Sequence, residues 1–218
     1  MKNLMLLLIV FALFVFNATL LYSQVTDIDG NQYKIVRIGN QEWMSENLNV
    51  THYRNGDPIP QVQDPEEWMS VTTGAWCYYG NSEENGKTYG KLYNWYAVND
   101  PRGLAPEGWH IPTEKEWKQL EETLGGYLIA GGKMKSISLW ENPNYGATNE
   151  SGFNALPGGF RGSFGKFHNI GRFNYFWSSS EDNVNFAWAT SLKYGSSAVI
   201  HTTDEKTYGF YIRCVMSE

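Results

Sequence analysis

The sequence has few residues of the kinds that carry metal or nucleophilic chemistry. It contains two cysteines and four histidines in 218 residues. The histidines are scattered singly, so none has the spacing of a metal-binding pair, and no serine stands in a nucleophile elbow. His110, beside Trp109 and Pro112, is interpreted as a structural histidine rather than a catalytic base. These absences argue against an enzyme, and we expect neither a cofactor nor a metal.

Basic residues are also too few to suggest a nucleic-acid partner. Seventeen Lys and Arg stand against twenty-three Asp and Glu, which gives a net charge of -6, and there is no basic run. A nucleic-acid-binding domain normally concentrates positive charge on one face or helix. We therefore expect no nucleic-acid partner.

Only one long apolar run is present, and it lies at the N-terminus. It extends from Leu4 to Phe16 behind Lys2, and small Ser23 follows. A membrane span needs about 20 apolar residues, so the run fits a secretory signal better. Residues 1–24 are expected to be a signal peptide, cleaved after Ser23 or Gln24, and 25–218 a single secreted or cell-surface domain. An uncleaved anchor is the alternative, and would be the chain's only contact with a membrane.

The two cysteines, Cys77 and Cys214, both lie in the part expected to be exported. Oxidising conditions there permit a bridge, so we expect them to form a disulfide. The alternative is two buried free thiols. No cysteine lies between the apolar run and Cys77, so no thiol near a new N-terminus is available for lipid attachment.

The first segment of the expected domain, residues 25–44, reads as a small antiparallel meander. Turn residues at 29–31 and 39–40 separate strand-like stretches. Asp27, Asp29 and Asn31 could offer oxygens to calcium at alternate positions, but no later acidic residue completes a loop of known spacing. A hairpin turn is favoured.

The clearest helix signal covers residues 112–126. Thr113 and Glu116 form a capping box, Trp117, Leu120 and Leu124 form one apolar stripe, and a glycine follows. A short helix is also expected over 92–98.

Several glutamates decorate this helix. They are interpreted as solvated side chains rather than a catalytic pair: Glu114, Glu116, Glu121 and Glu122.

From Phe153 onward the chain is rich in glycine and aromatic residues. Short runs bounded by turns read as strands at 155–161, 175–180, 186–192 and 209–215. Helices early and an antiparallel sheet late make an α+β domain.

Seven motifs in order together resemble the Fibrobacter succinogenes major paralogous domain, a family of exported bacterial domains of unassigned activity. They are 25–31 (VTDIDGN), 39–48 (GNQEWMSENL), 90–98 (GKLYNWYAV), 108–113 (GWHIPT), 155–159 (ALPGG), 177–181 (WSSSE) and 213–215 (RCV).

The helix-start string at 111–117, with the late tryptophan-serine strand, also resembles the wider C-type lectin-like fold. That resemblance implies an antiparallel sheet with two flanking helices, long irregular loops and neighbouring termini. Formylglycine-generating enzymes of this fold use a close pair of copper-binding cysteines, which this chain lacks. The Glu-Pro-Asn and Trp-Asn-Asp triplets of calcium-dependent lectins are absent too, although 141–144 (ENPN) comes near the first.

Binding is the function class that the sequence favours. Exposed aromatic rings can stack on sugar faces while polar side chains bond the hydroxyls. Residues 164–175 and 181–185 have that mixture, although each ring alone could be ordinary packing. The candidate ligand-binding residues are Phe167, His168, Asn169, Arg172, Tyr175, Glu181, Asp182 and Asn183.

The leading hypothesis is an exported, non-enzymatic domain that binds a glycan or an extracellular protein. A structural or assembly component of an extracellular complex is the alternative. A relative of the formylglycine-generating enzymes is a weaker third.

Overall fold

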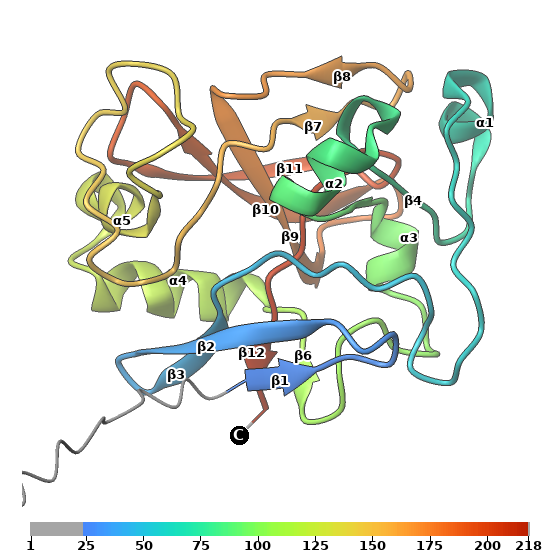
Figure 1. The fold of residues 1–218 in the computed structure, drawn as a ribbon, viewed down its shortest axis with the longest axis horizontal. Coiled ribbons are helices and arrows are strands. Elements are labelled where there is room, and N and C mark those ends of the chain that lie inside the picture. The colour runs from blue at the N-terminus through green and yellow to red at the C-terminus, as the bar shows by residue number, and fades with distance from the viewer. Residues whose placement is uncertain (1–23, 218) are drawn as a thin grey trace, which may run out of the picture.

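The computed structural model describes residues 24–217 and shows an α+β domain. The first and last described strands share one five-stranded sheet, which lies at the bottom of Figure 1. Its spatial order is β1-β2-β3-β12-β6, and every neighbouring pair is antiparallel. The strands are β1 (Gln24–Thr26), β2 (Gln32–Ile38), β3 (Gln41–Met44), β6 (Trp109–His110) and β12 (Val215–Met216). The expected meander at the start of the domain is confirmed.

A second, three-stranded antiparallel sheet stands above the first in the order β11-β10-β9. Its strands are β9 (Phe173–Glu181), β10 (Phe186–Lys193) and β11 (Val199–Glu205). The register of β9 and β10 shifts between Ala187 and Ala189. The strands predicted at 175–180 and 186–192 are therefore present, while the expected strand at 209–215 is mostly irregular chain ending in β12.

Two consecutive helices lie beside this sheet, α4 (Glu114–Thr123) and α5 (Tyr127–Met134) (Figure 1). The capping box at the start of α4 is confirmed: Thr113 Oγ1 accepts from the Glu116 backbone N–H, and the Glu116 carboxylate accepts from the Thr113 N–H. The predicted stripe of Trp117, Leu120 and Leu124 is buried. Packing of that stripe fixes α4 against β9 and β10.

The remaining elements are short. They are α1 (Pro65–Ser70), β4 (Trp76–Cys77), the 3₁₀ turn η1 (Tyr79–Asn81), α2 (Glu83–Tyr89), β5 (Leu92–Tyr93), α3 (Trp95–Val98), β7 (Phe160–Arg161) and β8 (Phe167–His168). The helix expected over 92–98 is wrong in its first half. Leu92 and Tyr93 pair with Cys77 and Trp76 as strands, and the helix begins only after the Asn94 N-cap.

Aromatic rings fill the core. Trp43, Trp117, Phe153 and Phe176 form one group with ring centroids 4.9–5.9 Å apart. Tilted and edge-to-face pairs of this kind add to the stabilisation that burial of the rings gives. The rings let a core form although large stretches of the chain have no regular structure.

Buried cations hold those irregular stretches in place. Lys135 is fully buried, and its ammonium donates to the backbone carbonyls of Tyr145 (2.9 Å), Lys193 (3.1 Å) and Ser196 (2.9 Å). Burial lowers the pKa of Lys135 to about 8. The side chain thereby joins the loop after α5 to the turn between β10 and β11.

Arg161 makes a similar connection between other loops. Its guanidinium donates to the carbonyls of Val62, Gln63, Asp64 and Gly165, and it stacks on the Trp68 ring. The loop before α1 is thus tied to the β7–β8 hairpin.

The cysteine prediction was wrong. Cys77 and Cys214 are free, buried thiols that belong to two separate core clusters. Cys77 is fixed by the pairing of β4 with β5, whereas Cys214 lies just before β12, and each packs among apolar neighbours. The alternative of two buried thiols is the one observed.

No helix within residues 24–217 is long and apolar enough to cross a membrane. The expected signal peptide, residues 1–24, lies outside the described residues except for Gln24, the first residue of β1.

The Lys135 contacts predict a large loss of stability on removal of the charge alone. Lys135→Met keeps an apolar side chain but leaves the carbonyls of Tyr145 and Ser196 without a donor, while that of Lys193 keeps only the Ser196 N–H, so the free energy of unfolding should fall by about 2–4 kcal/mol. Urea unfolding followed by tryptophan fluorescence measures it. The exposed Lys115→Met on α4 serves as the control and should change stability by less than about 0.5 kcal/mol. Equal effects of the two substitutions would contradict the anchoring role.

The burial of the thiols predicts low reactivity. Burial raises the pKa of Cys77 to about 11 and also raises that of Cys214, so neither forms the reactive thiolate near neutral pH. A thiol reagent such as Ellman's should detect no cysteine in the folded protein and two after unfolding in guanidinium without a reductant. Detection of none in the unfolded, unreduced protein would show that the two cysteines are bridged after all.

Candidate functional site

A pocket of about 360 Å³ opens beside the β7–β8 hairpin, and half of the residues that line it carry rings. We call it the aromatic pocket. It is lined by Phe160, Gly162, Ser163, Phe164, Lys166, His168, Asn169 and Tyr208. The Phe164 side chain is 74% exposed, so an aromatic face is available to a ligand from solvent.

The hairpin positions these rings. Phe160 and Arg161 pair with His168 and Phe167, and Gly165 in the turn has φ +73°, a conformation that favours glycine. The Phe160 ring lies 5.3 Å from that of His168 and stacks on that of Tyr208 at 6.0 Å. Arg161, the second residue of β7, holds the turn by donating to the Gly165 carbonyl. The pocket wall is therefore built on a fixed backbone.

Of the residues predicted from the sequence, His168 and Asn169 line the aromatic pocket. Tyr175 supports it from behind, with its ring 4.9 Å from that of Phe160. Phe167 points to the other side of β8 and packs against Tyr79.

The other predicted residues are not brought to the pocket. Arg172 forms an ion pair with Glu141 (2.8 Å). Glu181 ends β9 at the far end from Tyr175 and pairs with Lys206. Asp182 and Asn183 form the tight turn into β10, where Asn183 Oδ1 accepts from two backbone N–H groups.

Sequence reasoning missed Phe160 and Tyr208 as pocket residues. They are 48 positions apart in the sequence and lie together where Arg161 forms a bridge with Gly209. Phe164 stood in the segment singled out from the sequence but not among the candidate residues. Phe164 stands between Gly162 and Gly165 in a short stretch that also contains Ser163 and Lys166. This pattern indicates a turn, and it could have been used to predict that the Phe164 ring is exposed.

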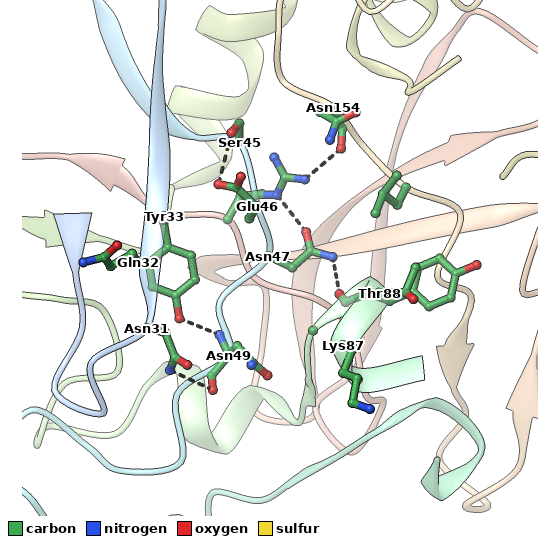
Figure 2. Close-up of a pocket in the computed structure, with 15 residues that line it drawn as sticks. Asn31, Gln32, Tyr33, Ser45, Glu46, Asn47, Asn49, Lys87, Thr88 and Asn154 are labelled. Carbon is green, nitrogen blue, oxygen red and sulfur yellow. Dashed lines mark hydrogen bonds between the residues drawn. The ribbon is translucent and has the colours of Figure 1, made fainter. Parts of the chain in front are cut away.

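A second pocket of about 270 Å³ lies between β2, the chain after β3, and α2 (Figure 2). We call it the amide pocket because many of its walls are carboxamides. The polar side chains that line it include Asn31, Gln32, Glu46, Asn47, Asn49, Asn154 and Arg213. Arg213, 1% exposed, donates to Asn47 Oδ1 at 2.7 Å, and Asn47 Nδ2 donates to the Tyr89 carbonyl at 2.8 Å.

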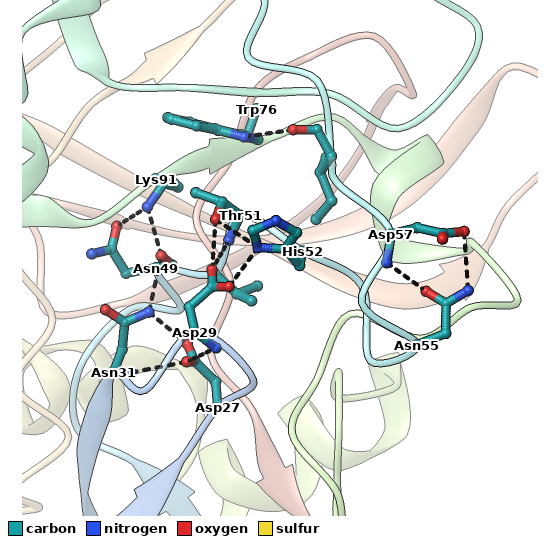
Figure 3. A network of polar contacts seen from close by, with 12 residues as sticks. Asp27, Asp29, Asn31, Asn49, Thr51, His52, Asn55, Asp57, Trp76 and Lys91 are labelled. Atoms are coloured by element: carbon teal, nitrogen blue, oxygen red, sulfur yellow. Dashed lines mark hydrogen bonds and ion pairs between the residues drawn. The ribbon is translucent and has the colours of Figure 1, made fainter.

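A polar network continues from this pocket toward the β1–β2 turn (Figure 3). Asp27 accepts from the backbone N–H groups of Asp29 and Asn31 (both 2.9 Å), so this segment is the hairpin turn that the sequence favoured. Lys91 donates to the Asn49 carbonyl (2.6 Å) and side chain (2.8 Å), and burial lowers its pKa to about 8.

His52 closes the network, with its Nδ1 2.6 Å from Asp29 Oδ1. Burial works to raise the pKa of Asp29, but hydrogen bonds from Thr51 and His52 outweigh it and lower that pKa. The carboxylate is thereby kept charged, and it ties the first turn of the domain to the chain at 51–52.

The prediction that the glutamates of α4 are solvated is wrong for two of them, Glu116 and Glu121. Glu116 Oε1 lies 2.6 Å from His110 Nε2, and Glu121 Oε2 lies 2.8 Å from His201 Nε2. Both carboxylates are partly buried, so they connect α4 to β6 and β11 rather than projecting into water. His110 therefore has the partner expected of a structural histidine.

Within residues 24–217, no group of three or more histidine, cysteine, aspartate or glutamate side chains is arranged to hold a metal ion.

The protein is thus an α+β domain, and irregular loops form much of the lining of its pockets. The model of the Fibrobacter succinogenes major domain matches residues 36–216. The chain belongs to this family, and the resemblance seen in its motifs is confirmed. Neither a search of curated proteins nor a search of solved structures found a match.

The His110–Glu116 pair predicts a dependence of stability on pH. Burial tends to raise the pKa of Glu116, but hydrogen bonds from His110 and Thr113 outweigh it and lower that pKa from 4.5 to about 2. This carboxylate therefore stabilises the folded state fully above pH 4.5, and the contribution is lost as the pH falls toward 2.

Glu116→Gln should accordingly be less stable than the parent protein at pH 6, and the difference should shrink between pH 4.5 and 2. Thermal unfolding across that range measures it. The exposed Glu122→Gln on the same helix is the control and should show no such convergence. A difference that stays constant with pH would rule out the charge of the Glu116 carboxylate as its cause.

Proposed function

We propose that this protein is an exported, non-enzymatic binding domain that recognises glycans through the aromatic pocket. The observation that supports this most is the exposed Phe164 ring beside the hydrogen-bonding side chains of Lys166, His168 and Asn169. An aromatic face covers the apolar face of a sugar, and the polar groups bond its hydroxyls. The pocket's volume lies within the usual range for small-ligand sites.

The domain architecture is proposed to be a variant of the C-type lectin-like fold. In support, β1 and β12 belong to one sheet, two consecutive helices lie beside the second sheet, and long irregular segments connect the strands. Binding residues are found disproportionately on loops that a rigid scaffold positions. The aromatic pocket lies on such a loop region.

The experiment is a glycan array probed with the purified exported protein, once with calcium and once with chelator. We expect reproducible binding to one sugar class that chelator does not remove. Loss of binding with chelator would show a calcium dependence that the sequence argues against.

Phe164→Ala should weaken binding of any positive glycan about tenfold, because it removes the stacking face. Val184→Ala is the matched control, because Val184 is also an exposed apolar side chain but lies in the turn between β9 and β10. Equal affinities of the two variants would exclude the aromatic pocket as the site. A silent array with folded protein would exclude simple glycan recognition.

The second candidate, a component of an extracellular assembly, is favoured by a different surface. Large exposed apolar side chains are concentrated on α5 and the loop that follows it. They are Tyr127, Leu128, Ile129, Ile137, Leu139 and Tyr145. Such side chains often mark protein contacts. A formylglycine-generating activity has no comparable support, because both thiols are buried and in separate clusters.

A further inference from the structure

The amide pocket has a buried charged group at its base with a hydrogen-bond donor to spare. Arg213 is 1% exposed, and four of its five N–H hydrogens have protein acceptors. These acceptors are Asn47 Oδ1 and the carbonyls of Met44, Phe153 and Asn154. The second hydrogen on Nη2 has no acceptor among residues 24–217, and Arg213 lines the pocket. A buried donor left without a partner is costly, so a ligand or water that accepts from it is favoured.

Acceptors and further donors lie on the surrounding walls. Glu46 Oε2 accepts from the Lys34 N–H (2.8 Å) and from Ser45 Oγ (3.1 Å), which fixes the carboxylate and leaves Oε1 for a ligand. The side-chain amides of Gln32 and Asn154 line the same space and make no hydrogen bond within the part of the chain that the structure describes. The pocket thus offers both donors and acceptors from a fixed frame.

The charges in the pocket nearly cancel. Arg213 is positive and Glu46 negative, while Lys87 at the rim is paired with Glu84 at 3.0 Å. An anion would gain from Arg213 but be repelled by Glu46, and a cation would meet the reverse. A neutral ligand with several hydroxyl groups satisfies both, because each hydroxyl can donate to the carboxylate and accept from an N–H.

We infer that the amide pocket is a second binding site, which takes a neutral polyol the size of one sugar ring. Its volume of about 270 Å³ is below the range for drug-sized ligands, which fits a single ring better than an oligosaccharide. The site is independent of the aromatic pocket, with which it shares no residue.

Saturation-transfer NMR on protein purified from cells expressing the full-length chain tests this directly. The probes are glucose, galactose, mannose and xylose, with glucuronate as the anionic comparison. At least one neutral sugar should bind with a Kd of about 1 mM, and glucuronate should bind more weakly. Silence from every neutral sugar, or a preference for glucuronate, would overturn the inference.

Substitutions then locate the site. Glu46→Gln should weaken binding about tenfold, because a hydrogen bond to a charged group is replaced by one to a neutral amide. Gln32→Ala, on the exposed face of β2, should weaken binding of the sugar severalfold. This second variant tests the site even if Glu46→Gln does not fold. The control is Glu42→Gln on β3, which lies outside the pocket and should bind as the parent does.

Phe164→Ala separates the two sites. It should leave binding of the monosaccharide unchanged, whatever its effect on array glycans. If Phe164→Ala abolishes binding while Glu46→Gln and Gln32→Ala do not, the sugar belongs to the aromatic pocket and the amide pocket is not a site. Failure of the amide pocket would leave the proposed function of the aromatic pocket intact.

Discussion

The bonding of buried cations to backbone carbonyls is the interaction on which the rest of this structure depends. Much of the chain between the two sheets is irregular, and buried carbonyls without a partner would cost too much for such segments to be interior. Lys135, Arg161 and Arg213 each make three or four hydrogen bonds to backbone carbonyls, most of which lie far away in the sequence. These cations have carbonyls and amides as their hydrogen-bond partners instead of carboxylates, so their charge is spread over several dipoles.

Both pockets stand next to such an anchor. Arg161 holds the turn from which the wall of the aromatic pocket is built, and Arg213 forms the base of the amide pocket. A binding site on a loop loses affinity if the loop must be ordered when the ligand arrives. Here the loops are already ordered when the domain folds, because Arg161 and Arg213 hold them in place. The same hydrogen bonds therefore stabilise the domain and fix the shape of its pockets.

Local patterns in the sequence were enough to predict α4, its cap, the N-terminal meander and strands β9 and β10, because each depends on neighbours within a few residues. The predictions that failed depend on contacts between distant positions. Glu121 read as solvated because nothing nearby in the chain shows that His201 lies beside it. The pairing of Phe160 with Tyr208 and the separation of the thiols are likewise set by topology. The burial of Lys135, Arg161 and Arg213 depends on the same kind of long-range contact.

The buried cations also explain why two cysteines can remain free in a chain that we propose to be exported. Small exported domains commonly use disulfides to tie together loops that a small core cannot hold. In this domain Lys135 and Arg161 make those ties between segments 58 and 99 positions apart, without a covalent bond. A cysteine is then retained for its packing: Cys77 and Cys214 each fill a place in an apolar cluster. The disulfide was expected because the domain is predicted to be exported and contains two cysteines. In the structure, buried cations hold the loops together instead.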